Sequence, residues 1–243
     1  MKKAIGYVYV IAAAVCWGFL GLFNRVLTAA GVSLLKMMPL RFGGTAILFT
    51  VFCMMFKQQV FHIKLRHLPI FLGSGLISML LVLCGCALVS GIVGSDVGIS
   101  LEGLLMGLAS ELCYGGYTIF THYGMRYCDS FTMAYWTFLI AGIASLFLAD
   151  GPALLSALAE PRTGLAALGL MVMGTALPFT LYTKGLETVE SGKAAIIANI
   201  EPVMSAVIGV TVFQETLGLW TLVGIVLVLS GVVVLACEKE PDK

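Results

Sequence analysis

The chain has 243 residues, of which 60% are hydrophobic and only 11% are charged, and its mean hydropathy is +1.03. Soluble globular proteins carry about 25% charged residues, so 14 basic and 13 acidic side chains are too few to cover a water-soluble surface. The net charge of +1 argues against a nucleic-acid-binding domain, which needs a basic face. The composition predicts an all-α polytopic membrane protein.

Apolar runs long enough to cross a bilayer follow one another along the chain. A hydrocarbon core of about 30 Å requires about 20 apolar residues of helix. Eight runs meet this requirement: Ala4–Phe23, Met37–Phe56, Leu68–Gly94, Leu101–His122, Phe131–Ala149, Thr163–Thr183, Ala194–Phe213 and Leu219–Cys237. The third is overlong and rich in glycine, so it either tilts or breaks and re-enters. The first is too long for a signal-peptide core, so we expect it to be retained.

The basic residues predict the orientation of these spans. With the N-terminus inside, the inner segments hold ten of the 14 Lys and Arg residues. The outer segments hold the remaining four: Arg25, Lys36, Arg41 and Arg162. Cytoplasmic loops carry the excess of Lys and Arg, so we expect both termini in the cytoplasm. The expected location is the plasma membrane or the bacterial inner membrane.

An internal repeat relates the first span to the fourth. A shift of 97 positions aligns Cys16-Trp17-Gly18 with Cys113-Tyr114-Gly115. Further along, Val82-Leu83 matches Val228-Leu229 only at a shift of 146 positions. The difference of 49 residues is enough for two helices and a turn, so the first copy of the repeat is expected to lack such a segment.

This arithmetic divides the chain into a first repeat, residues 1–100, with three spans, and a second repeat, residues 101–243, with five. Both numbers are odd, so the second repeat enters the membrane from the opposite side. Inverted repeats of this kind are typical of secondary transporters, whose substrates bind near the bilayer midplane. The junction is expected near Ser78–Leu81, inside the overlong third run.

The second half also resembles a known family. Its matching features are Gly174-Thr175-Ala176, Tyr182, Ser191-Gly192, Glu201-Pro202-Val203, Glu215, Gly224 and Gly231, and the first half adds Trp17-Gly18 and Arg41-Phe42. The chain is similar to EamA-type members of the drug/metabolite transporter superfamily. This resemblance implies a ten-helix fold of two five-helix repeats, here shortened to eight transmembrane helices, three plus five, without a first-repeat counterpart of residues 182–217.

Two acidic residues are candidates for substrate binding. Glu111 lies at the centre of the fourth span, where a carboxylate is costly and must face a cavity or a partner. It either couples transport to a proton or cation, or forms a structural hydrogen bond to a neighbouring helix. Glu201, with Asn199 close by, either binds a cationic group or pairs with a polar group of another span. Pro202 and Pro178 are predicted to kink their spans.

Three further side chains complete the candidate substrate site. Trp17 and Tyr114 lie deep in their spans and are expected to line a cavity and stack on a ligand. Arg41 lies about one turn inside the outer boundary, where it either snorkels to the headgroups or attracts an anionic substrate.

These residues favour secondary transport of a small metabolite or drug by alternating access. The expected coupling ion is a proton. The alternative is a non-transporting family member that acts as a structural or accessory membrane protein, and a homodimer is a further arrangement. No catalytic set is visible, so an enzyme is not expected. The seven cysteines form no C-x-x-C pair and His62 and His67 have no partnering ligand, so neither a metal nor a cofactor is expected.

Overall fold

The computed structural model describes residues 2–33, 35–89 and 101–237, and every regular element among them is a helix, as predicted. The α-helices are α1 (Lys2–Gly18), α2 (Leu20–Ala29), α3 (Thr45–Phe56), α4 (Leu68–Val89), α5 (Leu101–Gly124), α6 (Ser130–Ser145), α7 (Gly151–Ala159), α8 (Pro161–Met171), α9 (Leu177–Gly185), α10 (Ser191–Ala198), α11 (Ile200–Phe213) and α12 (Leu219–Cys237). Two π-helical segments, η1 (Pro39–Gly44) and η5 (Val172–Ala176), precede α3 and α9.

Every predicted span overlaps one helix or a run of consecutive helices. Within the described ranges, five segments are long and apolar enough to cross a membrane: Ala4–Ala29, Pro39–Phe56, Ser130–Leu148, Pro161–Gly185 and Ser191–Phe213. Helix α4 continues through the predicted junction at residues 78–81, and residues 90–94 of the predicted third span lie outside the described part. Eight crossings in an incomplete inverted repeat stay a prediction.

Several long helical segments change geometry part-way along. A turn at Phe19 separates α1 from α2, and another at Asn199 separates α10 from α11. Pro202 has no backbone N–H, so the carbonyl of Ala198 lacks the helical partner that residue 202 would supply. In the third such segment, η5 lies between α8 and α9, and Pro178 occupies the first turn of α9. A short helix that the hydropathy pattern did not predict, α7, lies between α6 and α8.

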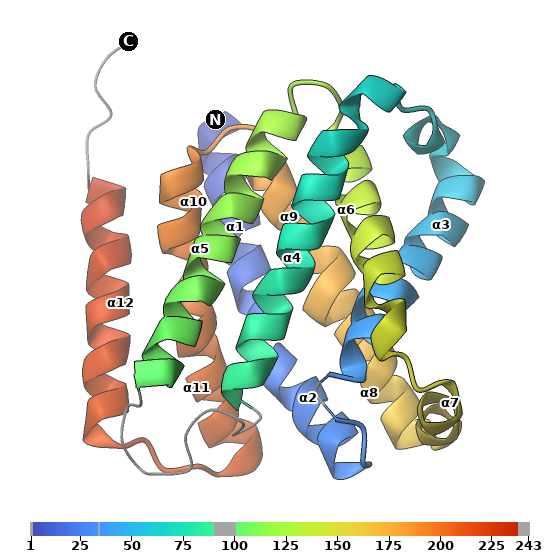
Figure 1. Cartoon of the computed structure of the whole chain (residues 1–243). Helices are drawn as coiled ribbons and strands as arrows, with labels where there is room; N and C mark the ends of the chain where they lie inside the picture. Colours follow the sequence, from blue (N-terminus) through green and yellow to red (C-terminus); the bar gives the residue numbers. More distant parts are fainter. Residues whose placement is uncertain (1, 34, 90–100, 238–243) are drawn as a thin grey trace.

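The helices form a bundle with two distinct ends. Figure 1 shows the start of α1, the end of α12 and the α3–α4, α5–α6 and α9–α10 connections at one end, and α2, α7 and the α11–α12 connection at the other. The first end, which we call the basic end, carries Lys57, Lys64, Arg66, Arg126, Lys184 and Lys193. The opposite end carries Arg25, Lys36 and Arg162. Lys239 and Lys243 lie outside the described residues.

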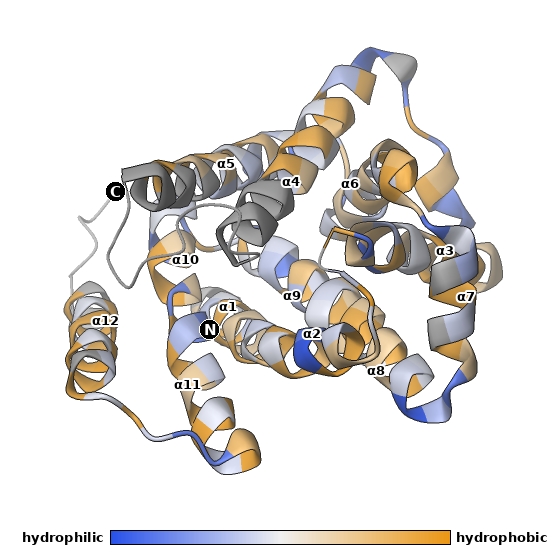
Figure 2. Ribbon diagram, turned by 60° about the horizontal axis from the view of Figure 1, so that its bottom comes forward, coloured by the Kyte–Doolittle hydropathy of each residue, from blue (hydrophilic) through white to orange (hydrophobic). Residues whose placement is uncertain are grey.

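Large apolar side chains cover much of the outside of the bundle. On α3, Ile47 and Met55 are 66% and 68% exposed, and on α12 Val226 is 61% exposed. Figure 2 shows hydrophobic residues along most of the helices of the bundle. A water-soluble protein rarely exposes continuous apolar surface of this kind, and a lipid-facing bundle requires it.

Glycines allow α1 to approach its neighbours closely. An added Cβ at Gly185 in α9 would lie 2.5 Å from Cγ2 of Val10 and 3.0 Å from the carbonyl oxygen of Gly6. An added Cβ at Gly18 would lie 2.4 Å from Cβ of Met204 in α11. Since apolar burial does not drive association in lipid, such small-residue contacts carry much of the packing between membrane helices.

Candidate functional site

An aromatic cluster occupies the centre of the bundle. The Trp17 ring of α1 lies 5.1 Å from that of Phe179 and 5.4 Å from that of Tyr182, both on α9. It meets the Tyr114 ring of α5 edge to face at 6.4 Å, and Tyr114 lies 5.9 Å from Tyr182. Trp17 is only 4% exposed. The structure therefore brings two of the predicted site residues, Trp17 and Tyr114, into one cluster, and we call these four residues the central aromatic cluster.

Buried hydroxyl groups lie in and near the cluster, and some of them are poorly satisfied. The Thr118 and Tyr182 hydroxyls are 3.2 Å apart and share a hydrogen bond. Within the described part of the chain, four further buried hydroxyls make no well-formed hydrogen bond: those of Ser78, Tyr114, Tyr117 and Thr183. Two of them have weaker polar contacts, since Tyr114 approaches Tyr182, and Tyr117 approaches Thr121 and Thr183. An unsatisfied buried polar group is costly, so these oxygens mark a place where water or a polar ligand gains binding energy.

The two candidates on the broken helix lie at different distances from the cluster. Glu201 is half-buried in the first turn of α11 and is within electrostatic range of the Tyr114 hydroxyl. A carboxylate in this position is stabilised by the positive end of the helix dipole. Asn199, in the turn before α11, is exposed. Glu201 thus lies near the cluster, whereas the structure does not bring Asn199 into it.

Glu111 cannot be placed beside the other candidates. It belongs to α5, about one turn before Tyr114, but its side chain lies outside the described residues. Its role stays a prediction from the sequence.

Arg41 makes a contact that the sequence did not predict. It is half-buried in η1, and its Nε donates a hydrogen bond to Oγ1 of Thr175 in η5 at 3.2 Å. The Thr175 hydroxyl donates in turn to the carbonyl of Leu170 at 2.9 Å, and the Thr45 hydroxyl donates to the carbonyl of Met171 at 3.1 Å. Side chains therefore join the two π-helical segments and satisfy carbonyls where the helix widens. The Nε hydrogen bond of Arg41 thus goes to Thr175 and not to a residue of the central aromatic cluster.

Ion pairs join separate elements at the opposite end. Arg25 of α2 pairs with Glu215 of the α11–α12 connection at 2.5 Å, and Lys36 pairs with Asp150, just before α7, at the same distance. At the basic end, Lys57 approaches Asp129 only to 3.8 Å. Lys184 pairs with Glu187, which is only three residues further along the chain. Exposed pairs contribute little each, but their distribution ties the opposite end together more firmly than the basic end.

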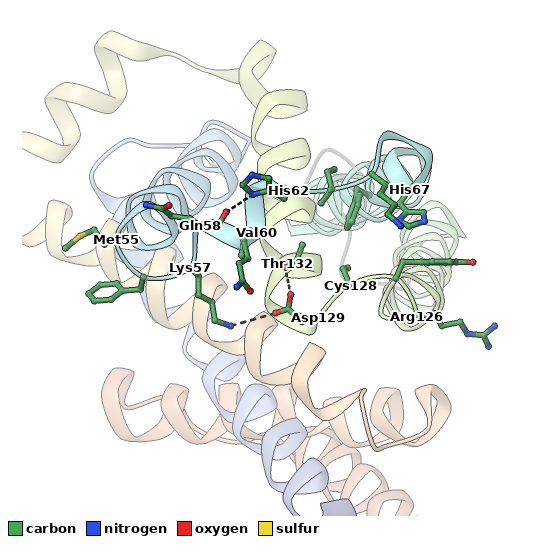
Figure 3. Close-up of a pocket in the computed structure, with 16 residues that line it drawn as sticks. Met55, Lys57, Gln58, Val60, His62, His67, Arg126, Cys128, Asp129 and Thr132 are labelled. Atoms are coloured by element: carbon green, nitrogen blue, oxygen red, sulfur yellow. Dashed lines mark hydrogen bonds and ion pairs between the residues drawn. The ribbon is translucent and has the colours of Figure 1, made fainter.

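A groove of about 1170 Å³ opens at the basic end between the α3–α4 connection and the α5–α6 loop. Figure 3 shows Lys57, His62, His67 and Arg126 around it, with Asp129 joined to Lys57 and to Thr132 by dashed lines. The groove is distinct from the central aromatic cluster, since no cluster residue lines it. The sequence drew attention to the two histidines but gave no reason to expect a groove.

Cys128, beside this groove, is expected to be a poor nucleophile. Burial, with a smaller contribution from the charge of Asp129, raises the pKa of its thiol to about 11, and Sγ donates weakly to the carbonyl of Gly124 at 3.6 Å. At pH 7 only about one thiol in ten thousand is ionised, against about 3% at the ordinary pKa of about 8.5. In a variant with Cys128 as its only cysteine, maleimide labelling should rise about tenfold per pH unit from pH 7 to 10.

The denatured protein provides the control for this labelling. Unfolding in SDS at pH 7 restores the ordinary thiol pKa, so labelling should accelerate by roughly two orders of magnitude. Equal rates in the folded and unfolded states at pH 7 would show that the thiol is not held in its protonated form.

Comparison with known proteins identifies the family. The family model described as the EamA-like transporter family matches residues 101–237. An uncharacterized transporter of Archaeoglobus fulgidus is 41% identical over 68 residues, which are 28% of this chain and 25% of that protein. The uncharacterized transporter YwfM of Bacillus subtilis is 26% identical over 174 residues, which are 70% of this chain and 57% of YwfM.

A shorter relative is the multidrug resistance protein EbrB of Bacillus atrophaeus, which is 32% identical over 87 residues, 35% of this chain and 74% of EbrB. The chain spans 25% of the length of the Archaeoglobus fulgidus transporter and 57% of the length of YwfM. The apolar helices and the family match together make it a multi-pass membrane protein. Since the family model covers more than half of its residues, this chain belongs to the EamA-like transporter family.

Proposed function

We propose that the protein is a secondary transporter that moves a small metabolite or drug by alternating access. The observation that carries this proposal is the central aromatic cluster, in which the buried Tyr114 hydroxyl makes no well-formed hydrogen bond within the described residues and only a weaker polar contact with Tyr182. Substrates of repeat-built transporters bind near the midplane between the repeats. Trp17 and Tyr114 belong to the first and second predicted repeats, so the cluster lies between them.

The proposed inverted repeat is supported by the meeting of equivalent residues. Trp17 and Tyr114 correspond to each other at the shift of 97 positions, and their rings are in edge-to-face contact. In a bundle with pseudo-twofold symmetry, only residues near the symmetry axis contact their own equivalents. The contact therefore favours a pseudo-axis that passes through the proposed substrate site.

Alternating access requires helices that bend, and three of the helices here are irregular. The hydrogen bond from Arg41 to Thr175 joins the π-helical segments η1 and η5, and beside it Thr45 of α3 donates to the Met171 carbonyl of α8. The turn at Asn199 divides α10 from α11 beside the cluster. π-Helical turns and broken membrane helices recur at functional sites. We infer that bending at these points opens the cluster, which is closed to solvent at Trp17.

The proposed substrate class is a flat aromatic cation. Rings of Trp and Tyr attract cations to their faces, and the half-buried Glu201 lies within electrostatic range of Tyr114. A planar ring system can stack within the cluster while its positive charge approaches the carboxylate. We propose that Asn199 contacts the substrate at the margin of this site on its way in or out. Arg41 repels a cation, so its proposed role here is structural, through its hydrogen bond to Thr175.

Proton coupling is the finer part of the proposal and rests on Glu111. If this carboxylate takes up a proton in each cycle, Glu111→Gln should remove the pH dependence of uptake and reduce uptake driven by a pH gradient by at least tenfold. Substrate exchange without a gradient should continue in the variant. The measurement is uptake into proteoliposomes between pH 5.5 and 8.5, and an unchanged pH profile would rule out Glu111 as the coupling group.

Transport is tested by counterflow in proteoliposomes, with a panel that includes aromatic cations and several classes of metabolite. Saturable counterflow is expected for at least one aromatic cation. Failure across every class would favour the alternative, a non-transporting family member that assists another membrane protein. Crosslinking in native membranes tests the homodimer, in which each subunit would supply a wall that the shortened first repeat lacks.

The proposed location is the plasma or bacterial inner membrane, with both termini in the cytoplasm. The support is the separation of charge along the bundle, since the basic end carries the start of α1 and the end of α12. Loops rich in Lys and Arg stay in the cytoplasm. Accessibility of single cysteines, placed at Gln58 and at Arg162, to an impermeant thiol reagent in intact cells tests this orientation.

A further inference from the structure

The groove at the basic end combines positive charge with an apolar flank. Three cations line it: Lys57 at the end of α3, Lys64 in the α3–α4 connection and Arg126 in the α5–α6 loop. Among the described residues, no carboxylate pairs with Lys64 or Arg126, and the one approach to Lys57, from Asp129, is loose at 3.8 Å. The groove therefore holds an excess of positive charge that the described protein does not neutralise.

The apolar flank is continuous with the lipid-facing surface of α3. Met55 and Phe56, which line the groove, are each 68% exposed, and Met54 on the same turn is 62% exposed. These side chains lie directly before Lys57, where the apolar helix ends. A ligand in the groove can therefore place a charged group against the cations while an attached hydrocarbon chain follows α3.

We propose that this groove binds the headgroup of an anionic phospholipid with two phosphates, whose acyl chains lie along α3. Basic pockets at the membrane boundary between helices bind such headgroups. The three cations less the one carboxylate of the groove, Asp129, leave a charge of about +2, which matches two phosphates better than one. The lipid site does not depend on the proposed transport function. It does not depend on the orientation of the chain either, since both leaflets contain phospholipids.

Asp129 limits the affinity of this site. It lies in the groove beside Lys57 and accepts a hydrogen bond from the Thr132 hydroxyl, so it repels a phosphate and competes for one of the three cations. The site consequently makes two opposite predictions, one for removal of a cation and one for removal of the carboxylate.

The test measures binding of cardiolipin to the purified full chain by native mass spectrometry, with phosphatidylglycerol as the single-phosphate lipid. A basic residue at a membrane surface contributes roughly a fivefold change in affinity. Lys64→Gln should weaken cardiolipin binding about fivefold, and Lys57→Gln/Lys64→Gln/Arg126→Gln should weaken it about a hundredfold. Asp129→Asn should strengthen it. Lys184→Gln/Lys193→Gln, at the same end but outside the groove, should have little effect.

Thermal unfolding of the wild-type chain in nanodiscs provides a readout that needs no variant. Cardiolipin should raise the melting temperature more than an equal charge of phosphatidylglycerol, and inorganic pyrophosphate should neither stabilise the chain nor displace cardiolipin. Equal binding by the wild type and the triple variant overturns the site. Displacement by pyrophosphate overturns the lipid assignment in favour of a soluble diphosphate, and equal stabilisation by the two lipids overturns the two-phosphate specificity.

Discussion

Replacement of Trp17 by alanine is expected to abolish saturable transport and to destabilise the protein strongly. The Trp17 ring contacts Tyr114, Phe179 and Tyr182, so its removal leaves a cavity at the meeting point of α1, α5 and α9. Truncation of a buried Trp or Phe to Ala costs about 3–5 kcal/mol in packed protein cores. Counterflow and the free energy of unfolding in SDS measure the two effects.

Two variants separate the loss of the ring from general damage. Trp17→Phe keeps an aromatic ring in the cluster and should retain part of the transport with a much smaller loss of stability. Phe56→Ala removes a ring that is 68% exposed on α3 and should leave both quantities near wild type. If Trp17→Ala transports as well as Phe56→Ala, the central aromatic cluster is not the substrate site.

Gly18→Ala is expected to force α1 and α11 apart. The added Cβ would lie 2.4 Å from Cβ of Met204, 3.2 Å from its carbonyl carbon and 3.3 Å from the amide nitrogen of Ser205. Backbone atoms cannot rotate away as a flexible side chain can, so the helices must separate. Overpacking of this kind costs typically about 1–3 kcal/mol. Because Gly18 follows Trp17 directly, we also expect transport to fall by at least tenfold.

The clash at Gly18 has a matched control and a distinctive rescue pattern. Gly115→Ala, at the equivalent position of the predicted second repeat, meets no described residue within 4 Å and should be tolerated. Met204→Ala should not rescue Gly18→Ala, because it keeps the Cβ that clashes, whereas Met204→Gly should rescue it in part. Wild-type stability and transport in Gly18→Ala would mean that α1 and α11 are not closely packed at this point.

The positions of the helices could be predicted from the sequence because the bilayer fixes the length of a membrane-crossing helix. A run of apolar residues of that length is visible in the local hydropathy. The interruptions were harder to predict. Pro202 signals a break, and the turn falls at Asn199, within one turn of it. Gly18 directly precedes the turn at Phe19, but glycines occur throughout these spans and did not single out this position, and η1 contains a proline only at its first position. These irregularities depend on contacts with other helices, such as the Thr45 hydroxyl that reaches the Met171 carbonyl.

The candidate site was only partly predictable for the same reason. Depth within a span singled out Trp17 and Tyr114, but their contact joins residues 97 positions apart in the chain and depends on the packing of α1 against α5 and α9. Phe179 could not be predicted as a site residue, because hydropathy does not distinguish an aromatic residue from the other apolar residues of its span. Arg41 was expected at the headgroups or on an anion, and its bond to Thr175 required the fold.

The most direct test of the proposed site is equilibrium binding of ethidium, a cation with a planar aromatic ring system, to the purified protein. We expect saturable binding that Glu201→Gln weakens at least tenfold while the variant keeps its wild-type unfolding transition. Trp17→Phe should weaken it less, and Glu215→Gln, which removes a carboxylate at the far end of α11, should not change it. The opposite result, no saturable binding or equal affinity in the wild type and Glu201→Gln, would contradict a cation site at the central aromatic cluster.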